Sequence, residues 1–217
     1  MNIAQLDIVV WIIIGVTAII SYKGFNDILF FRKYEFHIGS IRAGEHYRML
    51  TSAFLHGDMM HLIFNMLTLY FFAPIVIINM GILGFLIVYF ASLLAGSLLT
   101  LYFHKNDYHY RAIGASGAVI GVLYSAILFA PDQNLYLFFA IPIPTVVFGI
   151  GYLLYSIYGM KAKNDNIGHT AHFGGAIAGY AITLSRYPSM FYDNTLMVVL
   201  LAIPIVILLV MAKMGKI

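Results

Sequence analysis

Two residues that could form a nucleophile and its base, Ser116 and His172, lie in separate apolar stretches. Ser116 stands between Gly114 and Gly117, where we expect a helix to begin. The first turn of a helix has unpaired backbone N–H groups and the positive end of the helix dipole, which favour an anion beside the serine. An imidazole is the usual general base for a serine hydroxyl. The pair is a candidate for nucleophilic catalysis, although small residues around a serine are also typical of helix packing.

The segment around His172 has the same two interpretations. Gly175 and Gly179 form a G-x-x-x-G pair, which lets a neighbouring helix approach closely. His172 precedes Gly175 by three residues and so shares its helix face. A helix that carries Ser116 could pack there. His169 competes for the role of base, but we expect it at the membrane interface, closer to water.

A third polar group lies on another apolar stretch. His61 and Asn65 are four residues apart and therefore share one helix face. Both side chains can donate hydrogen bonds, and two convergent donors in a dry site could hold a developing oxyanion. Buried polar side chains also hold membrane helices together, which is the alternative for this pair. His56, nearer the helix start, is expected to be structural or interfacial.

Metal and cofactor chemistry find little support in the sequence. The chain has no cysteine, so thiolate sites and disulfides are excluded. It has eight histidines but no H-E-x-x-H motif. A zinc site from His56, His61 and His172 would lack that motif, and nucleotide, flavin and phosphate loops are absent. We predict neither a metal nor a cofactor.

The composition requires a membrane. The 217 residues are 62% apolar and 10% charged, whereas soluble domains are about 25% charged. Seven apolar stretches predict an all-α polytopic protein of one domain, 1–217, with a six-helix core at about 6–186 and a seventh helix at about 195–212. The first stretch is expected to be a retained helix, not a signal peptide. A net charge of +3 without basic runs favours contact with membrane lipids and excludes nucleic acid. The stretches lie at about 6–22, 54–78, 81–103, 114–130, 135–158, 168–186 and 195–212.

Prolines and one long loop give further expectations. Pro74 is expected to end the second helix, and Pro142 and Pro144 to bend the fifth. The loop 23–52 mixes charged and aromatic residues. So long a loop usually carries its own structure, and its composition predicts that it lies in the membrane interface.

Taken together, these segments resemble the rhomboid family of intramembrane serine proteases. The second core helix has an H-x-x-x-x-H-x-x-x-N pattern, the fourth opens with G-x-S-G, and the sixth has an alanine–histidine pair followed by glycines. The segment 45–48 takes the place of the family's Trp-Arg signature. The residues that carry the three motifs are His56, His61, Asn65, Gly114, Ser116, Gly117, Ala171, His172, Gly174, Gly175 and Gly179.

The resemblance implies a mechanism. Ser116 would attack a peptide carbonyl and His172 would take its proton, as a dyad without a carboxylate. His61, Asn65 and the backbone N–H of Ser116 would hold the oxyanion. Gly114, Gly117, Ala171 and Gly175 would support the site. The substrates would be single-pass transmembrane proteins, and the location a plasma membrane.

Three matters stay open at this stage. Many rhomboids place a tyrosine four residues after the serine, where this chain has Ile120. A poorly held base would fit a non-catalytic, derlin-type binding protein, and intramembrane histidines would also fit a small proton transporter or channel.

The basic loops gather on the side where Ser116 is expected to open. The positive-inside rule puts that side in the cytoplasm, whereas rhomboids of plasma membranes usually face their site outward.

Overall fold

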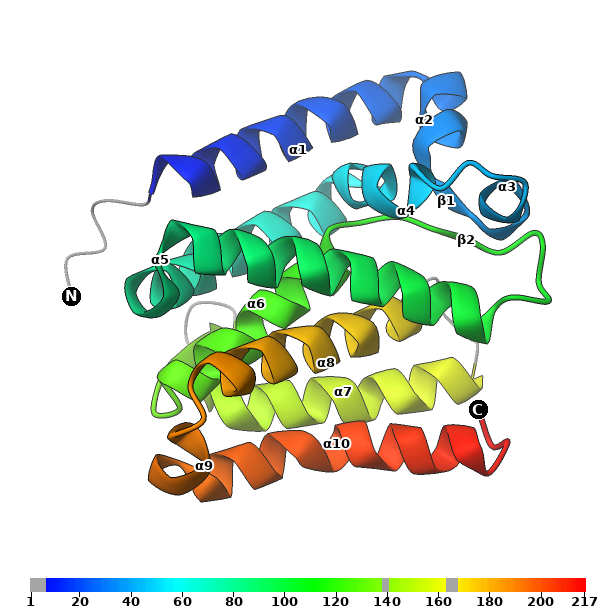
Figure 1. Ribbon diagram of the computed structural model, residues 1–217. Helices are drawn as coiled ribbons and strands as arrows, with labels where there is room; N and C mark the ends of the chain where they lie inside the picture. The colour runs from blue at the N-terminus through cyan, green and yellow to red at the C-terminus, as the bar shows by residue number, and fades with distance from the viewer. Residues whose placement is uncertain (1–6, 138–140, 163–167) are drawn as a thin grey trace.

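The computed structural model describes residues 7–137, 141–162 and 168–217, and it is mainly helical. Figure 1 shows the long helices running roughly alongside one another, with α1 at one edge and α10 at the opposite edge. The long helices are α1 (Ile8–Asn26), α5 (Met59–Phe103), α6 (Ser116–Phe129), α7 (Thr145–Ala162), α8 (His169–Arg186) and α10 (Thr195–Lys213). The short elements are α2 (Ile28–Tyr34), β1 (Phe36–His37), α3 (Ile38–Arg42), α4 (Arg48–Thr51), η1 (Ser52–Phe54), β2 (Arg111–Ala112), β3 (Asn134–Leu137), β4 (Ile141–Pro144) and α9 (Met190–Asp193).

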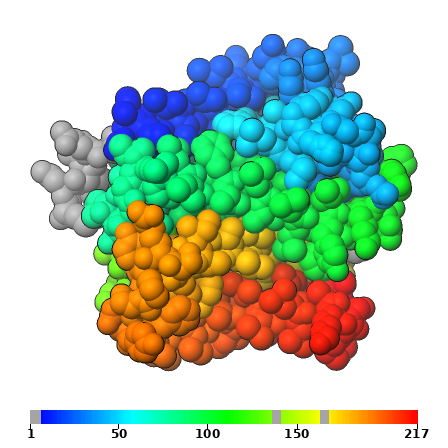
Figure 2. Space-filling model, viewed as in Figure 1, coloured from blue at the N-terminus to red at the C-terminus, as the bar shows by residue number. Residues whose placement is uncertain are grey.

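Three of these helices, α1, α5 and α10, are long and apolar enough to cross a membrane, and α6 is a shorter apolar helix. In the space-filling view, α1 and α10 form the two outer edges of the molecule (Figure 2). Many large apolar side chains on these helices are exposed, as expected for a surface that contacts lipid. The chain is therefore an all-α polytopic membrane protein, and the predicted seventh helix is present as α10.

The 45-residue helix α5 is two helices joined at Gly81. Gly81 has φ 72° and ψ 172°, a conformation that glycine adopts far more easily than other residues. Both halves run back from this turn in the same general direction (Figure 1). The prediction that Pro74 ends the second helix was wrong, because Pro74 lies inside it. A membrane helix tolerates the lost proline N–H when its surroundings compensate, so the helix continues to the glycine.

The prediction for the fifth helix was wrong over 135–137 and 141–144, which form strands, and its residues 138–140 lie outside the described residues. β3 and β4 pair antiparallel, with Pro142 opposite Tyr136 and Pro144 opposite Asn134. Alternate prolines have a fixed φ and no N–H, which suits a short two-stranded edge better than a helix. The helix α7 begins only at Thr145, whose N–H and hydroxyl both donate to the Gln133 carbonyl, at 2.9 and 3.0 Å.

Glycines bring α5, α6 and α8 into close contact, as their spacing predicted for α6 and α8. A Cβ on Gly175 would collide with the backbone of Gly117, and one on Gly179 with the backbone of Gly121. On the other side of α8, a Cβ on Gly174 would collide with the second half of α5. Where two helices face each other with glycines, no side chain separates them, so their backbones can come into direct contact. This contact fixes α8, and hence His172, against the start of α6.

We expect Gly175→Ala to lower the free energy of unfolding by about 1–3 kcal/mol, because overpacking a tight contact forces the backbones apart. Thermal unfolding in detergent micelles measures the change. Gly151→Ala on α7 is the matched control, since a Cβ there would meet nothing within 4 Å. Equal stability of the two variants would contradict the tight contact between α6 and α8.

The loop between α1 and α5 carries its own structure, as predicted, while its place in the membrane interface stays a prediction. β1 pairs with β2, with Phe36 opposite Ala112 and His37 opposite Arg111. The buried carboxylate of Glu35 bonds to Arg111 and to Arg32. The loop is thus joined to the segment that leads into Ser116.

A buried arginine and a neutral histidine make hydrogen bonds within this loop. Arg48 donates from Nη1 to the carbonyls of Arg32 and Glu35, at 2.8 and 3.0 Å. Partial burial, and after it the charges of Arg111 and Arg48, lower the pKa of His37. A neutral imidazole can accept a hydrogen bond, and Nδ1 of His37 accepts one from the N–H of Ser40 at 3.3 Å. This bond caps α3.

Candidate active site

Ser116 is the first residue of α6, and its Oγ lies 2.8 Å from Nε2 of His172 on α8. The serine is half-buried and the histidine is 2% exposed. The N-cap residue Ala115 provides no side-chain hydrogen bond to the first turn of α6. The N–H groups of that turn therefore lie beside the serine without a side-chain cap, as the oxyanion hypothesis requires.

Gly114 makes the turn that leads the chain into α6. Its φ of 111° lies in the region that favours glycine. Its N–H donates to the Ser52 carbonyl at 2.9 Å, which fixes the turn to η1. A Cβ on Gly114 would lie 2.7 Å from Nε2 of His61. The absence of a side chain thus lets the His61 ring approach the segment that carries Ser116.

The second predicted donor, Asn65, is 7% exposed, and its Nδ2 donates to the carbonyl of His61 at 3.0 Å. A primary amide has two N–H groups, so this bond leaves a second donor. Asp58 caps the helix, because its Oδ1 accepts from the N–H of His61 at 2.8 Å. The helix start therefore positions both side chains, and their role in holding an oxyanion stays a prediction.

The other two histidines of the motifs lie at defined places. His56 is buried, and its Nδ1 lies 2.9 Å from Oγ of Ser21, which itself can donate to the Phe54 carbonyl at 2.9 Å. Nδ1 then donates to Ser21, and Nε2 accepts from the N–H of Ala115 at 3.4 Å. This chain of bonds links α1 to the start of α6, and it fits the structural role predicted for His56.

His169 is 4% exposed and is the first residue of α8, so it is buried within the protein, while its place at the membrane interface stays a prediction. Its ring packs where a Cβ on Gly159 would otherwise stand. The edge of the ring meets Tyr155 at 5.5 Å between centroids. The glycine on α7 therefore allows the ring to be buried. Of the two histidines, His172 is the one that is hydrogen-bonded to Ser116.

Sequence reasoning missed one residue, Tyr152 on α7. Its hydroxyl lies 3.0 Å from Nδ1 of His172, on the side of the ring away from Ser116. No motif marks this tyrosine. The one signal in the sequence was the absence of a tyrosine at Ile120, which left the second nitrogen of the base without an evident neighbour.

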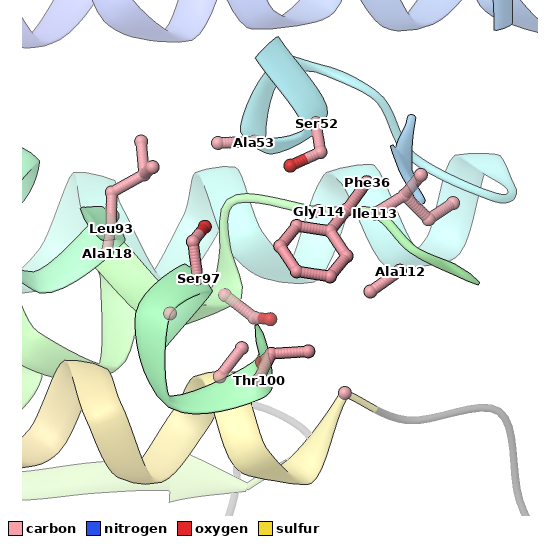
Figure 3. Close-up of a pocket in the computed structure, with 14 residues that line it drawn as sticks. Phe36, Ser52, Ala53, Leu93, Ser97, Thr100, Ala112, Ile113, Gly114 and Ala118 are labelled. Carbon is pink, nitrogen blue, oxygen red and sulfur yellow. The ribbon is translucent and has the colours of Figure 1, made fainter. Parts of the chain in front are cut away.

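A cavity of about 30 Å³ adjoins Ser116, enough for about two water molecules. Figure 3 shows side chains of α5, Ser97 and Thr100, on one side of it, with Ser52 of η1 on another. Ser116, Gly117 and Ala171 complete the wall nearest the dyad. Within the described residues, no group of three His, Cys, Asp or Glu side chains is placed to hold a metal ion.

The family model described as the Rhomboid domain matches residues 43–189. RHOMBOID-like protein 12, mitochondrial, of Arabidopsis thaliana is 30% identical over 186 residues, which are 78% of this chain and 55% of that protein. Rhomboid protease GluP of Bacillus subtilis is 32% identical over 140 residues, 64% of this chain and 26% of GluP. Rhomboid protein 1, mitochondrial, of Saccharomyces cerevisiae is 30% identical over 135 residues, 60% of this chain and 39% of that protein.

The chain therefore spans about half the length of the Arabidopsis relative and about a quarter of GluP. The matched region contains α5, α6, α7 and α8, and with them Ser116 and His172. It ends before α10, which lies outside the matched domain. On the family match and the polytopic helical fold, this chain belongs to the rhomboid family of integral membrane proteins.

Proposed function

We propose that the protein is an intramembrane serine endopeptidase with Ser116 as nucleophile and His172 as general base. The observation that carries the proposal is the 2.8 Å contact between Oγ and Nε2 at the uncapped start of a helix. A serine beside an imidazole at such a helix start has both a base and donors for an oxyanion. The relatives include a protein named as a rhomboid protease, GluP.

In the acylation step, Oγ of Ser116 attacks the carbonyl carbon of the scissile peptide as Nε2 of His172 takes the hydroxyl proton. The carbonyl oxygen becomes an oxyanion, which the Ser116 N–H, His61 and Asn65 stabilise. The tetrahedral intermediate collapses, the C–N bond breaks, and the imidazolium gives its proton to the leaving amine. The product is an acyl-serine and a new amino terminus.

In the deacylation step, a water molecule gives a proton to His172 and attacks the acyl carbonyl. The cavity beside Ser116 has room for this water next to the dyad, within a largely apolar bundle. Collapse of the second intermediate returns the proton to Ser116 and releases a carboxylic acid, which then loses its proton to water. The cavity therefore offers room for the water that hydrolysis needs inside a membrane.

The proposed substrate class comes from the resemblance to the rhomboid proteases. A bond that reaches Ser116 from the membrane must come from a transmembrane helix that can unwind to an extended strand, so single-pass membrane proteins are the proposed substrates. The predicted plasma membrane is not singled out by the relatives, since two are named as mitochondrial. We therefore propose a membrane location without assigning the membrane.

A fluorophosphonate probe tests the proposal directly. The wild-type protein in detergent is expected to label covalently, with the adduct on the peptide that contains Ser116 by mass spectrometry. His172→Ala is expected to label much more slowly, because the hydroxyl loses its base. A folded wild type that does not label would reject the protease and favour the binding-protein alternative.

A further inference from the structure

The side of His172 that faces away from Ser116 is occupied by Tyr152. The hydroxyl lies 3.0 Å from Nδ1, and the ring centroids are 5.3 Å apart with 37° between the ring planes. The tyrosine thus meets the imidazole through its hydroxyl and does not stack flat on it. The two nitrogens of His172 contact one hydroxyl each, from α6 and from α7.

Both neighbours of His172 are hydroxyls, which can donate or accept, so the proposed role of His172 as base decides which nitrogen carries the proton. Nε2 can take a proton from Ser116 only when it has a free lone pair, so the hydrogen of the neutral ring must be on Nδ1. A buried N–H needs an acceptor, and the oxygen of Tyr152 is placed to accept it. The same oxygen continues to accept from Nδ1 when the ring becomes an imidazolium.

The position of Tyr152 is itself fixed by contacts along α7. One turn earlier, the Gly149 carbonyl accepts a hydrogen bond at 2.9 Å from the hydroxyl of Tyr124 on α6. The ring of Phe148 stacks on that of Tyr152 at 5.7 Å. Further along, Gly159 makes room for His169 of α8. On α7, Tyr152 therefore lies between a contact with α6 and a contact with α8. The packing of these three helices positions its hydroxyl beside His172.

Tyr155 and His169 show that the register is that of two antiparallel helices. Tyr152 meets His172, and three residues later on α7, Tyr155 meets His169, three residues earlier on α8. The two pairs differ in one respect that serves as a control. Tyr152 touches the histidine that is bonded to Ser116, whereas Tyr155 touches the one that is not.

We propose that Tyr152 is the positioning residue of this active site, which holds His172 in the tautomer that can accept the proton of Ser116. The inference rests on the proposed protease function for its kinetic consequences. It assigns to α7 a part of the catalytic apparatus that the family motifs do not carry in this chain, where position 120 is isoleucine. The dyad then has a neutral third partner instead of a carboxylate.

The test is Tyr152→Phe, which keeps the ring and removes the hydroxyl. We expect kcat on a transmembrane substrate to fall about tenfold with KM unchanged, since one hydrogen bond that selects the tautomer is lost. Histidine labelled with ¹⁵N gives a readout that packing alone does not move. The His172 signals, identified by their absence in His172→Ala, should show a protonated Nδ1 in the wild type and a mixture of tautomers in Tyr152→Phe.

Tyr155→Phe is the matched control, and it should leave both kcat and the His172 signals unchanged. A Tyr152→Phe protein with wild-type kcat and a wild-type tautomer would overturn the inference while leaving the protease proposal intact. The nitrogen signals do not depend on turnover. A shift of tautomer in a protein that cleaves nothing would therefore support the role of Tyr152 and count against the proposed function separately.

Discussion

Replacement of Ser116 by alanine is expected to lower kcat/KM for cleavage of a transmembrane substrate by about 10⁵-fold. Serine hydrolases lose activity on this scale when the nucleophile is removed, because the base and the oxyanion donors then have no group on which to act. Of the two hydroxyls that contact His172 in the described part of the chain, that of Ser116 lies at Nε2 and that of Tyr152 at Nδ1, so Tyr152 does not take the place of the serine.

The measurement uses purified protein in liposomes and a single-pass fusion protein whose cleavage releases a fluorescent domain. Ser185→Ala is the control, since this serine is exposed near the end of α8 and its hydroxyl donates within its own helix, to the Ile182 carbonyl. Ser185→Ala should retain wild-type turnover. Full cleavage by purified Ser116→Ala would mean that the nucleophile lies elsewhere.

Replacement of Asn65 by alanine is expected to reduce kcat about 10²-fold to 10³-fold, with little effect on KM. The loss of one oxyanion donor has this size, because the charge develops only in the transition state. Asn65 reaches the His61 carbonyl with one amide hydrogen and retains another for the oxyanion. The same liposome assay measures the change in kcat and KM.

Asn79→Ala separates this role from helix stability. Asn79 lies on the same helix and makes the same type of bond, from Nδ2 to the carbonyl four residues earlier, at 2.8 Å. It is exposed and lies about four turns further along the helix than Asn65. If both variants lose activity equally, Asn65 supports the helix and not the oxyanion.

Most of the architecture could be predicted because a helix that crosses a membrane needs a long apolar run, which is visible in the sequence. Apolar runs identified every long helix, and glycines four residues apart identified the contact of α6 with α8. The errors arose where backbone geometry outweighed hydropathy. The segment 135–144 is as apolar as a helix, but its alternate prolines favour strands, and Pro74 matters less than the left-handed conformation at Gly81.

The site could be predicted only in part. Ser116 and His172 are marked by motifs, and the structure places them 2.8 Å apart, while their chemical roles await experiment. Tyr152 could not be found from the sequence, since its relation to His172 depends on how far α7 slides along α8. That register depends on the packing at Gly149 and Gly159. The residue pattern of one sequence does not reveal it.

The turn at Gly81 also offers a direct way to establish orientation. Because one residue joins two helices of about 22 residues, each about 33 Å long, we expect its two neighbours to lie at one membrane face and residues 58 and 104 at the other. The chain contains no cysteine, so a single cysteine at Ile82 or at Asp107 would be the only thiol in the protein. An impermeant maleimide added to sealed vesicles would then react at one face only, and the face of Asp107 is the one on which the segment leading to Ser116 begins.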